Sequence, residues 1–129
     1  MIDLKLIQQI SVALRDLFPD IYIGGQHENT PITLPAVLMD MKSEGVVGGP
    51  LNRGTLTAEV TSQADESNPS DHGELVKQIS SAIIALTGSE DEIKIAGVVY
   101  SGSDSFRAER HFQTNLQFIV GYHEANLTC

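Results

Sequence analysis

One segment, from Leu56 to Leu86, constrains the fold of this chain more than any other. It begins with Leu56, Ala58 and Val60, which alternate with threonine and glutamate in the period of a half-buried strand. An acidic, polar turn follows. Apolar residues then recur at the three- and four-residue steps of an amphipathic helix. We therefore predict a strand, a turn and a helix in that order, with their apolar faces buried in one core.

Both ends of this helix carry sequence signals. Asn68 is a good N-cap, and Pro69 suits the first helical position because its missing N–H would be unpaired there anyway. Asp71 and Glu74 fall in the first turn, where the helix dipole favours acidic side chains. Gly88 is placed to cap the C-terminal end. These signals predict a helix that begins at Pro69 and ends shortly before Gly88.

The rest of the chain contains one further helix and several strands. Periodicity predicts the helix at Asp3–Leu17 and the strands at Ile21–Ile23, Ala36–Glu44, Thr55–Gln63, Ile93–Tyr100 and Arg107–Tyr122. Ile93–Tyr100 is apolar on both sides, which predicts a central strand, and Gly97 within it indicates a bulge. The small polar residues Ser101–Ser105 predict a turn, and the Gly45–Gly54 segment predicts a long hairpin connection.

The element order is therefore α-β-β-β-α-β-β. We predict an α+β fold, in which two amphipathic helices cover one face of a mostly antiparallel sheet of about five strands. The 129 residues show no internal repeat or linker, so we expect one domain over residues 1–129. Residues 123–129 are expected to form a flexible tail.

Charge and cysteine content exclude several classes of function. The formal net charge is −9, and the eight basic residues are scattered, so we expect no specific binding of nucleic acid. An acidic total is also compatible with a protein lining a passage through which DNA slides. Cys129 is the only cysteine, which excludes an internal disulfide and fits a reducing cytoplasm. We expect no signal peptide, no membrane span and no membrane partner.

No catalytic, cofactor or metal motif is present in the sequence. His72 has no second ligand one helical turn away, and a zinc-protease pattern starting at His123 fails because position 127 is leucine. The carboxylates cluster in polar turns, where nothing would raise their pKa for acid catalysis. We therefore expect solvent-exposed histidines. The alternative of an enzyme or ligand-binding domain requires His27 and His111 to converge in a pocket with acidic neighbours.

Four segments together resemble the tail terminator or tail-completion proteins of long-tailed bacteriophages, and the resemblance covers about Ile2 to Tyr122. An opening helix ends in Leu17-Phe18-Pro19, and a strand is entered through Leu34-Pro35-Ala36-Val37. The strand from Leu56 to Val60 leads to the helix from Leu75 to Leu86, and a closing strand runs from Phe112 to Tyr122.

This resemblance implies a structural protein without catalysis or cofactor. Six copies would form a ring that caps the tail tube, ends its polymerisation and contacts the head-completion or connector proteins. The partners would be other copies of the chain and the major tail tube protein, first in the host cytoplasm and then in the virion tail. Another neck or minor tail protein is an alternative in the same class.

Long loops are frequent contact surfaces, so the loop near residue 26 and the long hairpin are the expected sites of subunit contact. The residues chosen from these two segments, by position only, are His27, Glu28, Val46, Val47, Leu51 and Arg53.

Overall fold

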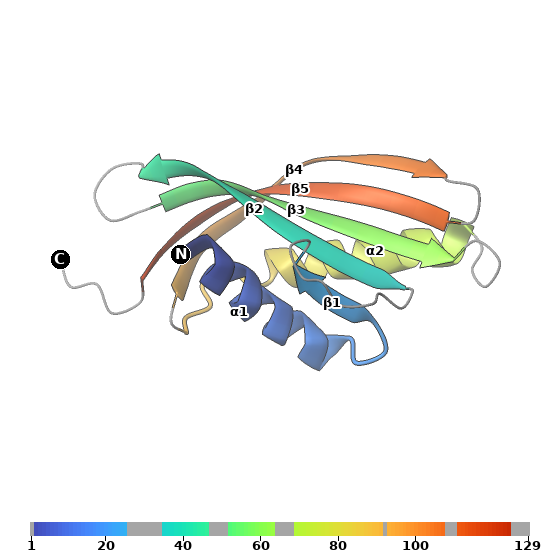
Figure 1. Ribbon diagram of the computed structural model, residues 1–129, viewed down its shortest axis with the longest axis horizontal. Helices are drawn as coiled ribbons and strands as arrows, with labels where there is room; N and C mark the ends of the chain where they lie inside the picture. Colours follow the sequence, from blue (N-terminus) through green and yellow to red (C-terminus); the bar gives the residue numbers. More distant parts are fainter. Residues whose placement is uncertain are drawn as a thin grey trace.

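A computed structural model describes residues 2–25, 35–46, 52–63, 69–91, 93–107 and 111–124. Two helices and five strands follow one another in the predicted order, α-β-β-β-α-β-β, and the α+β class is confirmed (Figure 1). Their bounds are α1 (Ile2–Leu17), β1 (Tyr22–Gly25), β2 (Ala36–Val46), β3 (Asn52–Gln63), α2 (Pro69–Ile84), β4 (Ile93–Arg107) and β5 (His111–Glu124).

The five strands form one mixed sheet in the order β1-β2-β3-β5-β4. Among the described strands, β1 and β2 pair in parallel and the other three pairings are antiparallel, so the predicted, mostly antiparallel sheet is confirmed. Both helices lie on the same side of this sheet (Figure 1). We call the opposite side, which neither helix covers, the open face.

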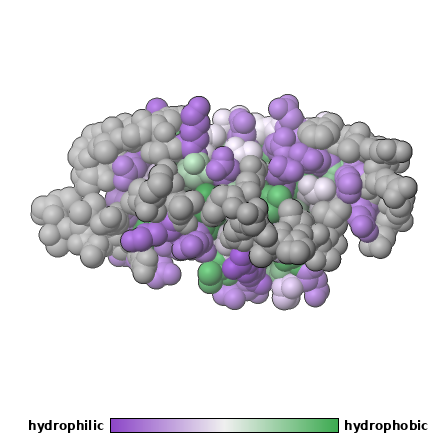
Figure 2. Space-filling view, in the orientation of Figure 1, coloured by the Kyte–Doolittle hydropathy of each residue, from purple (hydrophilic) through white to green (hydrophobic). Residues whose placement is uncertain are grey.

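The hydrophobic core fills the space between the sheet and the two helices. Leu56, Ala58 and Val60 of β3 are fully buried and face the helices, as their alternation predicts. The side chains of β2 and β5 on the same face of the sheet are also buried, and so are the predicted apolar stripes of both helices. The other core residues include Leu6, Ile10, Leu14, Val37, Met39, Ile79, Ile83, Leu116, Phe118, Val120 and Tyr122. In the view of Figure 2, the described surface is mainly hydrophilic, and hydrophobic residues show only in small patches.

Two side chains of α1 fasten this helix to the sheet. The Arg15 guanidinium donates hydrogen bonds of 2.9 and 2.7 Å to the carbonyl oxygen of Ile23 in β1. The Gln9 side chain donates to the carbonyl of Ile93 at 2.9 Å and accepts from its N–H at 3.0 Å. The helix is therefore tied to both edge strands by polar contacts as well as by its apolar stripe.

Glycines mark two local irregularities where the sequence predicts them. Gly88, four residues after the end of α2, has a φ of 88°, and its N–H donates to the carbonyl of Ile95 at 2.8 Å. The pairing of β4 with β5 shifts register between Ile95 and Gly97, so the predicted bulge is confirmed. At Gly88 the positive φ is one that residues with a Cβ adopt only at a cost.

The predictions for β4 are wrong in two respects. β4 is an edge strand and not a central one, and it continues to Arg107 through the segment Ser101–Ser105 predicted as a turn. Apolar residues on both sides of β4 indicated burial, but Val99 is 63% exposed and Tyr100 46%. After a register shift between Tyr100 and Gly102, the small polar residues continue to pair with β5, where an edge position allows their side chains to meet solvent.

Smaller differences concern the ends of strands. β5 begins at His111 and not at the predicted Arg107. Arg107 is instead the last residue of β4, and it pairs across the hairpin with Phe112. β3 begins at Asn52, three residues before the predicted start. The predicted tail lies outside the described residues from 125 onwards. In the described part of the chain, no helix is long and apolar enough to cross a bilayer.

Candidate functional site

The open face of the sheet carries polar, mostly uncharged side chains on its two central strands. Those of β3 alternate with core residues and are half-buried, as are Gln113 and Asn115 of β5. Because partners in an antiparallel register share a face, neighbouring strands continue the same surface. The residues predicted to face outward, and found on this face, are Thr55, Thr57, Glu59, Thr61, Gln113, Asn115 and Gln117.

An apolar pair interrupts this polar surface. Val99 of β4 and Ile119 of β5 lie directly opposite each other in the register, and Ile119 is 38% exposed. Thr55 of β3 is the next residue in the same row. Single exposed apolar side chains are ordinary on a protein surface, whereas these two lie next to each other.

Charged residues of β2, β3 and β4 lie on the same face. Asp40 and Lys42 of β2 are exposed, and both alternate with the buried Met39 and Met41. On β3, Arg53 is exposed and Glu59 is half-buried. Asp104 of β4 lies opposite Asn115 and is also exposed, so this face carries charges of both signs.

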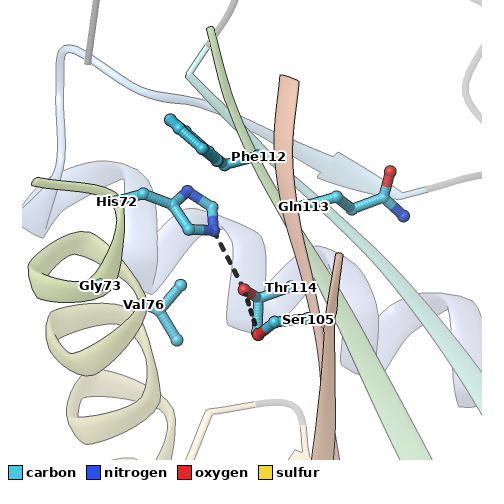
Figure 3. Close-up of a pocket in the computed structure, with 7 residues that line it drawn as sticks. All are labelled: His72, Gly73, Val76, Ser105, Phe112, Gln113 and Thr114. Atoms are coloured by element: carbon cyan, nitrogen blue, oxygen red, sulfur yellow. Dashed lines mark hydrogen bonds between the residues drawn. The ribbon is translucent and has the colours of Figure 1, made fainter. Parts of the chain in front are cut away.

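A second polar cluster lies on the helix side, beneath the first turn of α2. His72 accepts or donates one hydrogen bond with Ser62 of β3, at 2.9 Å from Nδ1, and one with Thr114 of β5, at 3.0 Å from Nε2. Thr114 is in turn 2.9 Å from the hydroxyl of Ser105 in β4 (Figure 3). The ring of Phe112 lies beside the imidazole, with 5.7 Å between the ring centroids. A cavity of about 340 Å³ adjoins this cluster.

Burial and the chemistry of its partners determine what His72 can do. The residue is only 8% exposed, and burial lowers the pKa of its imidazole below the ordinary value. Ser62, whose hydroxyl is hydrogen bonded to this imidazole, is itself only 2% exposed. The second ring nitrogen faces a threonine hydroxyl, whereas a catalytic histidine is usually oriented by a carboxylate. The arrangement is suited to holding α2 against β3 and β5.

The prediction of solvent-exposed histidines is therefore wrong for His72. Its position on the apolar stripe was the available signal, because Leu75, Val76 and Ile79 follow it at helical spacing. The sequence gives no indication of its hydroxyl partners, which lie on two distant strands.

The other histidines do not form the predicted alternative sites in the described structure. His111 and His123 are half-buried and lie near opposite ends of β5, so they do not converge. No group of three or more His, Cys, Asp or Glu side chains in the described ranges is placed to hold a metal ion. His27, which the alternative pocket also requires, lies outside those ranges.

Of the residues predicted to make subunit contacts, two are described. Arg53 is exposed in β3, and Val46 ends β2 opposite Asn52. Val47, Leu51, His27 and Glu28 lie outside the described residues. The contact itself stays a prediction for all six.

Comparison with known proteins gives one informative result. No protein-family model matches the sequence, and no curated protein matches it either. Among solved structures, a chain from a structure described as "Virion of native gene transfer agent (GTA) particle" has a similar fold, with a TM-score of 0.61. The two chains are 16% identical, and the match covers 91% of each. The likeness is one of fold.

Proposed function

We propose that this protein is a structural subunit of a phage-like virion. The observation that supports the proposal best is the fold shared with a chain of a gene transfer agent particle, which covers nearly the whole of both chains. A match of this extent relates complete architectures and not an isolated motif.

Within the virion, we assign the protein to the end of the tail tube as a tail terminator. Six copies form a ring that caps the tube, stops further addition of the major tail tube protein and receives the head-completion or connector protein. A head-to-tail contact between identical subunits produces such a ring when its rotation closes. The acidic charge lowers the attraction of the ring for DNA passing through it. Assembly takes place in the host cytoplasm, and the protein remains in the mature tail.

The expected ring contacts are the loop near residue 26 and the hairpin between β2 and β3. Arg53 lies at the base of that hairpin, on the exposed side of β3. A loop held between two long paired strands has a fixed base, and this favours a reproducible contact geometry.

Deletion of the gene from the phage or prophage that encodes it tests the proposal. We expect electron micrographs of the lysate to show tails of uncontrolled length that are not joined to heads. Purified protein added to the lysate is expected to restore joined particles. Tails of normal length, joined to heads without the protein, contradict the terminator role. Normal tails that fail only to join heads would support the alternative of another neck protein.

A further inference from the structure

The two margins of the described sheet differ in length and in how they are covered. β4, with 15 residues, is the last strand on one side (Figure 1). β1, on the other side, has only four residues, and Arg15 of α1 donates both of its hydrogen bonds to the carbonyl of Ile23 there. The long margin formed by β4 is therefore the better place for another chain to pair with this sheet.

The register of β4 shows which of its main-chain groups point outward. The N–H of Ile95 donates to Ser89, and its carbonyl accepts from Gly88, so both groups point away from β5. In an antiparallel pair this orientation recurs at every second residue, and β5, with Tyr122 opposite Ile95, is regular throughout its pairing with β3. The residues of β4 opposite every second residue of β5 beyond Tyr122 therefore also point outward; they are Val98, Tyr100, Ser103 and Ser105.

These four residues keep their outward main-chain groups available to a partner. Val98 is half-buried, and the other three are exposed. Within the described part of the chain, no hydrogen bond reaches their N–H or carbonyl groups from the outer side. An extended segment can add to such an edge as a further strand, with its main chain supplying the hydrogen bonds.

The side chains of the same four residues lie on the helix side of the sheet, where α2 runs alongside them. Their partners on β5 are buried on that side. The cavity of about 340 Å³ joins Gly73 and Val76, near the start of α2, to Ser105 (Figure 3). Gly88, beyond the end of the helix, is bonded to Ile95. α2 therefore follows the free edge of β4 in the opposite direction.

An added strand would place every second side chain between this edge and α2. Side chains on one face of neighbouring strands lie side by side, so these positions would adjoin Val98 and the 46% exposed Tyr100. The position beside Ser105 would adjoin the cavity, whose lining includes Val76 and Phe112. Burial of this apolar surface favours apolar side chains at these positions of the added strand.

On the open face, the added strand would meet a negative charge. Asp104 is exposed there, and it is the only charged residue among residues 98–105. In its row of the sheet, Asn115 of β5 is uncharged and Glu59 of β3 is acidic. Because opposite charges stabilise neighbouring strands and like charges destabilise them, a basic residue is favoured beside Asp104.

We propose that an extended segment of a different protein adds to β4 as a new edge strand, with apolar residues toward α2 and a basic residue beside Asp104. A second copy of β4 does not meet this description, because residues 98–105 contain no basic side chain. The register shifts within β4 also act against chance pairing, since bulges twist an edge and deter other edges from pairing with it. A segment shaped for this edge is therefore favoured. The contact goes beyond the proposed function, which assigns the ring contacts to two loops.

A designed peptide tests the inference in the purified, full-length protein. The probe is Val-Lys-Val-Thr-Val-Thr-Val with blocked ends, which places lysine beside Asp104 when it pairs antiparallel to β4. We expect NMR titration to shift the amide signals of β4 and to slow hydrogen exchange at its four outward N–H groups. Val-Val-Lys-Thr-Thr-Val-Val has the same composition without the alternation, and its dissociation constant should be at least about tenfold higher. Glutamate in place of lysine should raise it about fivefold.

Two variants at one position separate main-chain pairing from loss of the side chain. Ser103→Pro removes an outward N–H and leaves the bonds to β5 in place, so the dissociation constant of the alternating peptide should rise about tenfold. Ser103→Ala loses the same hydroxyl, which accepts from Tyr100 at 2.8 Å, but keeps the N–H. It should change the dissociation constant by less than about twofold. Circular dichroism identifies a variant that fails to fold, in which case the comparison of peptides decides.

Several results would overturn the inference. They are unchanged β4 signals in the titration, equal binding of the two peptides of one composition, and equal binding by the two Ser103 variants. Self-association of the purified protein that Ser103→Pro abolishes and Ser103→Ala does not would show that the partner is another copy of the chain. Because no tail component is present, all these results are independent of whether gene deletion impairs tails.

Discussion

At the scale of single residues, the contacts of His72 connect three elements that are far apart in the sequence. Its imidazole lies in the first turn of α2 and is hydrogen bonded to Ser62 of β3 and Thr114 of β5. In either neutral tautomer one ring nitrogen donates and the other accepts, and a hydroxyl can satisfy both roles. The neutral ring thus meets all its hydrogen-bonding needs inside the protein.

Truncation of this residue should reduce stability. His72→Ala removes both hydrogen bonds and leaves the buried Ser62 hydroxyl without its imidazole partner, while Thr114 keeps its bond to Ser105. Because a new cavity also forms, we expect the free energy of unfolding to fall by about 2–4 kcal/mol. Urea denaturation measures the change. Lys77→Ala, at an exposed position of the same helix, should change it by less than about 0.5 kcal/mol. If the free energy of unfolding fell no further in His72→Ala than in Lys77→Ala, the His72 cluster would not be important for stability.

The lowered pKa of His72 also predicts a pH dependence. In the unfolded chain the imidazole gains a proton near the ordinary pKa of 6.5, but in the folded protein burial delays protonation to lower pH. The unfolded state therefore binds more protons in this range, and stability falls as the pH drops below about 6.5. We expect His72→Gln to lose less stability than the wild type between about pH 7.5 and 5.5 in urea titrations. Parallel losses in the two proteins would contradict this assignment.

At the scale of elements, the ends of α2 illustrate how directly local chemistry determines structure. The helix begins at Pro69, as the cap signals predict, and Gly88 has the positive φ expected of a residue that follows a helix end. Local signals of this kind act through the nearest few residues, so they can be predicted without knowledge of the tertiary structure.

Two glycines near α2 should respond in opposite ways to the same substitution. Gly88→Ala forces a Cβ into a left-handed conformation and should lower the free energy of unfolding by about 1–2 kcal/mol. Gly73→Ala adds a methyl group that meets nothing within 4 Å inside a helix, and it should raise the same quantity by about 0.5–1 kcal/mol. Thermal denaturation of both variants measures these two changes in stability. Equal effects would mean that Gly88 is not constrained by its backbone conformation.

The strand β4 shows what pattern alone does not determine. Its apolar residues on both sides are compatible with a central strand, but strand order depends on which partners pair, and β5 lies between β3 and β4. The segment from Ser101 to Ser105 has turn composition, yet pairing with β5 outweighs local preference. Non-local pairing is thus the main reason for both errors.

The hairpin between β2 and β3 provides a test of the predicted subunit contacts. Val46 pairs with Asn52, so an Asn-Gly turn in place of residues 47–51 should close the hairpin without disturbing the sheet. We expect the melting temperature to be retained and tail completion to be lost in a complementation assay. Deletion of the whole segment from Val46 to Asn52 should have the same effect on tails. Normal tails in either variant would exclude the hairpin as a contact.

At the scale of the whole molecule, the element order and the side of each central strand that is buried could be predicted from periodicity. The alternation in β3 and β5 requires one face to be buried, and two amphipathic helices are available to cover it. The His72 cluster and the charge pattern of the open face could not be predicted in this way, because both depend on register between strands. The proposed function depends on the assembled surface of the protein and not on any single motif.

The location of the chain in assembled particles tests the central claim most directly. Electron cryomicroscopy of tails purified from the phage or prophage that encodes the protein should resolve the tube and its head-proximal end. We predict a ring of six subunits at that end, into which the fold described here fits with its sheet and helices resolved. A tube end occupied by a different fold, in particles that complete their tails, would contradict the account.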